Sequence, residues 1–131
     1  PMRSLETVAF QIDLITSIGD GIEDELVRYS LRDLNQIGKF FDELIRAWRE
    51  GDNAALERLF VDDMREFPEV YEALLAKRNR MWMKAFKKML TTPEVEFALV
   101  GAGHLVGPDG LLQSFEAMGC EVRMLDAKAS E

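Results

Sequence analysis

The chain has 131 residues, a net charge of −8, a pI near 4.7 and 47% apolar residues. So acidic a surface repels a phosphate backbone, and we expect no nucleic-acid partner. No apolar run approaches the ~18 residues of a membrane span, and no signal-peptide pattern opens the sequence, so we expect a soluble protein. Cys120 is the single cysteine, which excludes an internal disulfide and fits a reducing compartment.

The beginning of the chain shows the apolar spacing of helices. Apolar residues recur at helical spacing from Leu5 to Ile15, and Ser4 is the expected N-cap. The two glycines of IGDG, residues 18–21, break this helix. A longer helix is predicted over residues 22–50. Gly38 within it predicts a kink or a split, because glycine costs about 1 kcal/mol relative to alanine in a helix.

Two more helices are predicted in this part of the chain. Gly51 ends the long helix, and Asp52 or Asn53 caps a shorter helix over residues 54–66. A proline suits the first turn of the next helix, predicted over residues 68–90.

The pattern changes after the helical part, which covers residues 1–92. In residues 93–131, VEFALV (95–100) is an apolar run rich in strand formers, and CEVRML (120–125) alternates as a strand does. A helical pattern, Leu111 to Met118, lies between them. We therefore predict an α+β or α/β fold, mostly helical, with a C-terminal strand–loop–helix–strand unit. Because two strands alone are marginal, we expect missing sequence or a partner chain to complete the sheet.

His104, the only histidine, lies in the turn GAGHLVGPDG after the first predicted strand. Ligands bind beyond the carboxyl ends of strands in open α/β sheets, and a neutral imidazole can bind a transition metal or act as a general base. Gly101 and Gly103 leave room beside the ring. The alternative is a hydrogen-bonded histidine with a structural role, since one histidine does not make a metal site. The turn lacks the G-x-G-x-x-G pattern, so we expect no nucleotide there.

Arg78 falls on the apolar stripe of its predicted helix, between Leu75 and Trp82. A charge in this position is either paired and turned inward, or extends its head into water. Asn79 beside it offers a donor and an acceptor. Glu6 flanks the apolar stripe of the first helix, where the helix dipole is a sufficient reason for a carboxylate.

Aromatic side chains on the predicted helices are expected in the core. They are Phe40, Phe41, Trp48 and Trp82. The alternative is a contact with another helix, supplied by a missing half of the domain or by another subunit.

Four motifs together resemble the C-terminal half of the TraB/GumN family, which is related to the Tiki metalloproteases. They are LETVAFQ (5–11), AWREGD (47–52), LLAKRNRMW (74–82) and VGAGHLVGPDGLL (100–112). The last motif is similar to the second of the family's two G-x-x-H motifs. The first G-x-x-H motif is absent, so the resemblance implies that residues 1–131 are the C-terminal part of the domain.

The resemblance implies a peptidase-like hydrolase that depends on a divalent metal such as manganese, cobalt or zinc. By position, it implies as site residues Glu6, Arg78, Asn79 and His104, with His104 and Glu6 as metal ligands or bases and with Gly101 and Gly103 in the motif loop. Half a site is expected neither to catalyse nor to bind a metal tightly. The other half would come from the N-terminal half of the domain or a second copy of the chain, and the substrate would be a peptide. Bacterial relatives are often exported, which implies a periplasmic or extracytoplasmic location.

A second hypothesis is a binding or regulatory module without catalysis. The large helical share and the unpaired predicted strands both favour an association surface. Such a module would self-associate, because an orphan sheet edge invites pairing.

Overall fold

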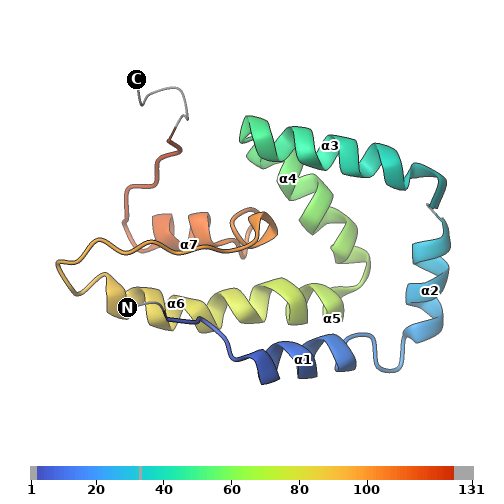
Figure 1. Ribbon diagram of the computed structural model, residues 1–131, viewed down its shortest axis with the longest axis horizontal. Coiled ribbons are helices and arrows are strands. Elements are labelled where there is room, and N and C mark those ends of the chain that lie inside the picture. The colour runs from blue at the N-terminus through green and yellow to red at the C-terminus, as the bar shows by residue number, and fades with distance from the viewer. Residues whose placement is uncertain (1–2, 33, 126–131) are drawn as a thin grey trace.

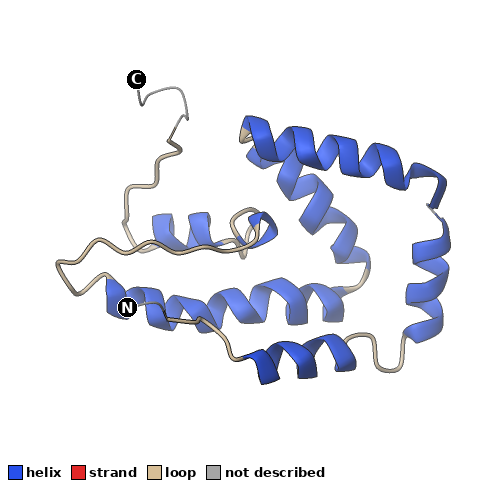
Figure 2. Cartoon of the chain, viewed as in Figure 1, coloured by secondary structure: helices blue, strands red, loops and turns tan. Residues whose placement is uncertain are grey.

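The computed structural model describes residues 3–32 and 34–125, which form helices joined by turns and extended loops (Figure 1, Figure 2). The α-helices are α1 (Val8–Ser17), α2 (Glu23–Arg32), α3 (Ile37–Glu50), α4 (Asn53–Glu57), α5 (Pro68–Tyr71), α6 (Lys77–Met89) and α7 (Leu111–Ala117). Short 3₁₀-helical or π-helical segments lie at Leu34–Gln36, Arg58–Asp62, Asp63–Glu66, Glu72–Ala76 and Ala102–His104. The helical character predicted for the first part of the chain is confirmed.

Two helix boundaries differ from the prediction. The N-cap of α1 is Thr7 and not Ser4, because the Thr7 hydroxyl accepts a hydrogen bond from the Phe10 amide at 3.1 Å. The long predicted helix is split, but the split falls at the 3₁₀ segment Leu34–Gln36, and Gly38 lies inside α3. Asp33, in the same predicted helix, lies outside the described residues.

The other predicted boundaries follow the expected chemistry. Gly51 ends α3 with a φ of 67°, a backbone conformation that favours glycine. The Asp52 carboxylate caps α4 by accepting a hydrogen bond from the Ala55 amide at 3.0 Å. Pro68 opens α5, where its missing N–H has no helical partner to lose.

The predicted strand–loop–helix–strand unit is wrong. Within the described part of the chain, residues 95–100 and 120–125 are extended but belong to no sheet, and only the helix between them, α7, is confirmed. Val95, Phe97 and Leu99 are 100%, 89% and 86% exposed, so this apolar run is no buried strand. A strand needs a neighbour for its ladder of hydrogen bonds, and no other described segment provides one. The α+β or α/β class is therefore replaced by an all-helical arrangement of the described residues.

Two groups of buried side chains hold the helices together. The first joins α3 and α4 to the segments that follow them and to the loop before α7; its members are Ala47, Ala55, Leu56, Val61, Leu75 and Val106. The second joins α6 to α7 and consists of Trp82, Met83, Phe86 and Leu111. The prediction of a core position is confirmed for Trp82, which is 5% exposed, and is wrong for Phe41 and Trp48, which are 52% and 64% exposed.

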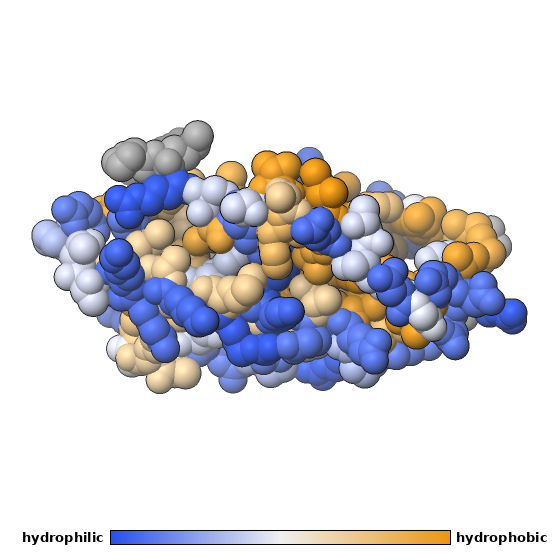
Figure 3. Space-filling model, turned by 90° about the horizontal axis from the view of Figure 1, so that it is seen from below, coloured by the Kyte–Doolittle hydropathy of each residue, from blue (hydrophilic) through white to orange (hydrophobic). Residues whose placement is uncertain are grey.

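The α5–α6 segment runs along the middle of the molecule, with α1 on one side and α3 and α4 on the other (Figure 1). The extended residues after α6 return along α7 (Figure 1). Figure 3 shows apolar side chains interspersed with polar ones, with a gathering of apolar surface toward the end where α2 lies. None of the helices formed by the described residues is long and apolar enough to cross a membrane.

Gly110, the N-cap of α7, has no room for a side chain. A Cβ atom there would lie 2.5 Å from the carbonyl oxygens of Leu105 and Val106. We expect Gly110→Ala to lower the free energy of unfolding by about 2 kcal/mol, because backbone has to move. The matched control is Gly38→Ala inside α3, where nothing lies within 4 Å of the added Cβ and a gain of about 0.5–1 kcal/mol is expected. Urea unfolding measures the stability of both variants. Equal effects of the two changes would contradict the close contact at Gly110.

Candidate functional site

The candidate site begins with an ion pair between the start of the chain and α6. The Glu6 carboxylate accepts hydrogen bonds from Arg78 Nε at 2.8 Å and from Arg78 Nη2 at 2.9 Å. The side chains are only 3% and 16% exposed, respectively. Arg78 is therefore paired and turned inward, which is one of the two predicted alternatives, and does not extend its head into water. Glu6 precedes the N-cap of α1, so pairing with Arg78, and not the dipole of α1, accounts for its position.

Trp82 joins this pair to the histidine. Its indole Nε1 donates to Glu6 Oε1 at 2.9 Å, and its ring centroid lies 4.4 Å from that of His104. The Arg78 guanidinium carbon lies 5.0 Å from the indole centroid, within cation–π range. Arg78 and Trp82 are one helical turn apart on α6, which puts both on the face that receives Glu6. Trp82 was predicted only as a core residue, and its polar role was missed.

Asn79 fixes the histidine turn from behind. Asn79 is 2% exposed, and its Nδ2 donates to the carbonyl oxygens of His104 at 3.1 Å and of Asp109 at 2.8 Å. These two carbonyls determine which end of the amide carries the nitrogen. The amide oxygen then lies 2.7 Å from His104 Nδ1.

This arrangement selects one tautomer of His104. An amide oxygen only accepts hydrogen bonds, so Nδ1 has to carry the proton and, in the neutral ring, Nε2 has the free lone pair. Nε2 bonds to no described residue, and no fully buried side-chain nitrogen or oxygen in the described residues lacks a partner. It follows that Nε2 is reachable from solvent. Metal-binding histidines commonly have this arrangement, with the second ring nitrogen held by a hydrogen bond.

The surroundings also keep the ring neutral. Burial of the imidazole and the positive charge of Arg78 lower the pKa of His104 to about 4, while the negative charge of Glu6 acts in the opposite direction. For Glu6, burial opposes ionisation, but the hydrogen bonds from Arg78, Gln11 and Trp82 and the charge of Arg78 lower the pKa of the carboxyl group. At neutral pH the site therefore holds a neutral imidazole beside a carboxylate–guanidinium pair.

The pKa of His104 gives a pH dependence of stability. Between its lowered folded-state pKa and its ordinary value of 6.5, the unfolded chain binds a proton that the folded chain does not. The free energy of unfolding should therefore fall as the pH drops, by about 2 kcal/mol from this group between pH 7 and pH 5. Urea titrations at both pH values should show this extra loss for the native chain relative to His104→Gln. The same loss in both proteins would contradict the assignment.

Three of the four predicted site residues line a cleft, and the fourth, Asn79, does not. Glu6, Arg78, Trp82 and His104 line a cleft of ≈ 670 Å³, which Phe97 and Leu99 also line. Asn79 does not line the cleft and lies behind the imidazole. The structure thus brings together all four residues that the sequence analysis singled out: Glu6 is bonded to Arg78, His104 is bonded to Asn79, and Trp82 contacts both pairs.

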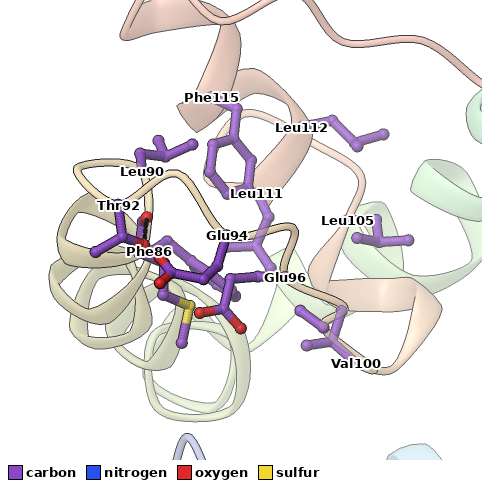
Figure 4. A pocket seen from close by; sticks show the side chains of 12 residues that line it. Phe86, Leu90, Thr92, Glu94, Glu96, Val100, Leu105, Leu111, Leu112 and Phe115 are labelled. Carbon is purple, nitrogen blue, oxygen red and sulfur yellow. Dashed lines mark hydrogen bonds between the residues drawn. The ribbon is translucent and has the colours of Figure 1, made fainter.

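An apolar pocket of ≈ 370 Å³ adjoins this cleft, and Phe86, Met89 and Val100 border both spaces. Figure 4 shows Phe86 from α6 and Phe115 from α7 projecting into it. The carboxylates of Glu94 and Glu96 lie on the side of the extended segment that follows α6 (Figure 4).

Gly101 and Gly103 were expected to leave room beside the His104 ring, and the structure shows only a small effect of this kind. Neither Gly101 nor Gly103 has a positive φ; in this loop that conformation occurs at Gly107, with a φ of 84°. A Cβ at Gly101 would meet only the His104 ring, at 3.8 Å, an ordinary contact. A Cβ at Gly103 would lie 3.1 Å from the Phe60 ring, so this glycine allows close packing against Phe60.

A second anchor of the loop was missed by the sequence analysis. The Tyr71 hydroxyl donates to Asp109 Oδ2 at 2.8 Å, and burial together with this carboxylate raises the pKa of Tyr71 to about 12. The two residues are far apart in sequence, so no local pattern announces the contact. The bond holds the same residue, Asp109, whose carbonyl Asn79 binds.

The residues could supply one metal ligand and not a complete set. In the described residues, no three His, Cys, Asp or Glu side chains are grouped so that they could hold a metal ion. Both oxygens of Glu6 already accept hydrogen bonds, including one from Gln11 at 3.3 Å. His104 fits a metal through Nε2, whereas Glu6 does not while it is paired with Arg78.

These features define a helical protein with a buried Glu–Arg–Trp–His–Asn network at the edge of a cleft. A model of the TraB/PrgY/gumN family matches residues 1–124, and the chain belongs to that family. The match covers nearly the whole chain. That the chain is only the C-terminal half of the family's domain stays a prediction. Comparisons with curated proteins and with solved structures found no match.

Proposed function

We propose that this chain supplies part of the site of a metal-dependent, peptidase-like hydrolase, with His104 as a metal ligand or general base. The observation that supports this most is the free Nε2 of a neutral imidazole whose Nδ1 is held by Asn79. A divalent ion such as manganese, cobalt or zinc would lower the pKa of a bound water and polarise a carbonyl group. The remaining ligands would come from a second copy or from residues other than those described.

In this proposal, Glu6 positions Arg78. The guanidinium has five N–H donors, of which two bind Glu6 and one binds the Leu74 carbonyl. Two donors are left at the edge of the cleft, where they would hold a substrate carbonyl or the oxyanion that develops from it. A direct role of Glu6 as a metal ligand stays a prediction that first requires its release from Arg78.

The adjoining apolar pocket supports a substrate with an apolar side chain. Its lining is mostly aliphatic and aromatic, and it shares a wall with the cleft that holds His104. A peptide bound along the cleft would place a side chain in the pocket. Leu90→Trp, at an exposed position that lines the pocket but not the cleft, would narrow the pocket and should reduce cleavage after large apolar residues more than after small ones.

The test is metal-dependent hydrolysis by the natural protein that contains residues 1–131. A peptide library should be cleaved in the presence of Mn²⁺, Co²⁺ or Zn²⁺ but not with a chelator, and His104→Gln should lose at least 100-fold in rate. Lys87→Ala, on the exposed side of α6, is the control and should retain activity. Full activity of His104→Gln would end the proposal.

A second candidate function, a binding module that self-associates, is favoured by a different observation. Many large apolar side chains of α1, α2 and α3 are about half exposed or more, including Ile12, Val27 and Ile45. Exposed apolar side chains in such number are typical of an interaction surface. This candidate predicts association without hydrolysis.

A further inference from the structure

One side of α3 presents large apolar side chains to solvent. Ile37, Phe41, Ile45 and Trp48 expose 52%, 52%, 46% and 64% of their surfaces. Their spacing of four, four and three residues puts them on one face of the helix. They form a continuous stripe, called here the α3 stripe.

The α3 stripe belongs to a helix that is firmly packed on its neighbouring side. Ala47 is 1% exposed, and Leu44 packs against the same buried group. These residues fix how α3 is turned. The stripe is therefore presented outward by the packing of the fold.

Two charges line one edge of the α3 stripe. Asp42 follows Phe41 and Arg49 follows Trp48, and the seven-residue spacing puts both charges on the same side of the helix. Neither is paired with a described residue. Other charges of α3 are engaged within the chain: Glu43 with Arg58, and Arg46 with Glu50.

The order of these charges is self-complementary when the helix direction is reversed. An antiparallel second α3 puts its Arg49 opposite Asp42, and its Asp42 opposite Arg49. A parallel copy related by a two-fold axis would instead put the two charged edges on opposite sides of the contact, where these charges do not meet. Reversal also brings Phe41 opposite Trp48 of the second copy, and leaves Ile45 near the two-fold axis.

We propose that the α3 stripe is a contact surface between two copies of this chain, packed antiparallel with Asp42 opposite Arg49. The contact is isologous, with the same patch used by both copies. This inference deepens the second candidate function, a module that self-associates, and does not depend on the proposed hydrolase activity.

The area of the α3 stripe determines how strong a dimer we expect. Aromatic side chains bury about 150–250 Å² each, so eight large apolar side chains that are half exposed would remove at most roughly 800 Å². Stable complexes bury about 1,200–2,000 Å². We therefore expect a weak dimer, with a dissociation constant in the micromolar range.

Sedimentation equilibrium over a concentration series of the chain tests the contact. The mass should rise from 14.9 kDa toward twice that value. Ile45→Ser should weaken the dimer at least tenfold, whereas Val95→Ser, in the exposed segment that follows α6, should leave it unchanged. Circular dichroism shows whether both variants are folded. A monomer at every concentration would overturn the proposal, and so would equal effects of the two changes.

A charge exchange tests the antiparallel direction. Asp42→Arg alone and Arg49→Asp alone should each weaken self-association about tenfold, because each puts like charges opposite one another. An equal mixture of the two single variants should associate as the native chain does, since every opposing pair is then of opposite sign. The double variant should behave in the same way. Failure of the mixture to associate would overturn the antiparallel contact.

Discussion

Replacing Asn79 by leucine is expected to lower the free energy of unfolding by about 3–5 kcal/mol. Leucine has the same branched shape with bulkier ends, so the change leaves no cavity and adds some overpacking at this buried position. It removes the partners of three groups: the Nδ1–H of His104, the carbonyl of His104 and the carbonyl of Asp109. Each buried polar group without a partner costs about 1–3 kcal/mol. Equilibrium urea unfolding measures the loss.

Two further variants sharpen this prediction. Asn53→Ala, on the exposed start of α4, is the control and should change stability by less than about 0.5 kcal/mol. Asn79→Asp keeps an acceptor for Nδ1 but loses the two donated bonds, and its charge should raise the pKa of His104. A loss below 1 kcal/mol for Asn79→Leu would show that the network is not formed in solution.

Replacing Glu6 by glutamine is the second change with a large expected effect. The change removes the carboxylate that pairs with the little-exposed Arg78 charge. This should lower the free energy of unfolding by about 2–4 kcal/mol. The matched control is Glu43→Gln, whose pair with Arg58 is 37% and 58% exposed, respectively, and should cost less than about 1 kcal/mol. Urea unfolding at pH 7 compares them.

The same variant has a readout at the histidine. The negative charge of Glu6 opposes the lowering of the His104 pKa, so Glu6→Gln should lower that pKa further. Glu43→Gln should leave the pKa as it is. Equal losses of stability in the two variants, or a raised pKa of His104 in Glu6→Gln, would contradict the geometry described for the pair.

The helices could be predicted from sequence because their signals are local. Gly51, Asp52 and Pro68 act through their own backbone and nearest neighbours, and all three mark boundaries in the structure. Thr7 replaces Ser4 as N-cap, a choice between two nearby hydroxyls that spacing alone does not decide. The prediction of strands was wrong because a strand depends on a distant partner, and the sequence of residues 95–100 does not specify one.

The site was predictable in part. Arg78 drew attention because a charge on an apolar stripe needs a partner, and that partner proved to be Glu6. The bonds of Trp82 to Glu6 and of Tyr71 to Asp109 span 76 and 38 residues, respectively, and have no local signature. Exposure of Phe41 and Trp48 was likewise not predictable, because apolar spacing does not say what covers a helix face.

The most direct test of the account is a ¹⁵N NMR titration of the His104 ring. The chain has one histidine, so the imidazole signals need no assignment. The structure predicts a neutral ring with the proton on Nδ1 at pH 7, and a pKa of about 4. A proton on Nε2, or a pKa near the ordinary 6.5, would contradict the hydrogen bond to Asn79 and the free Nε2 on which the proposed function rests.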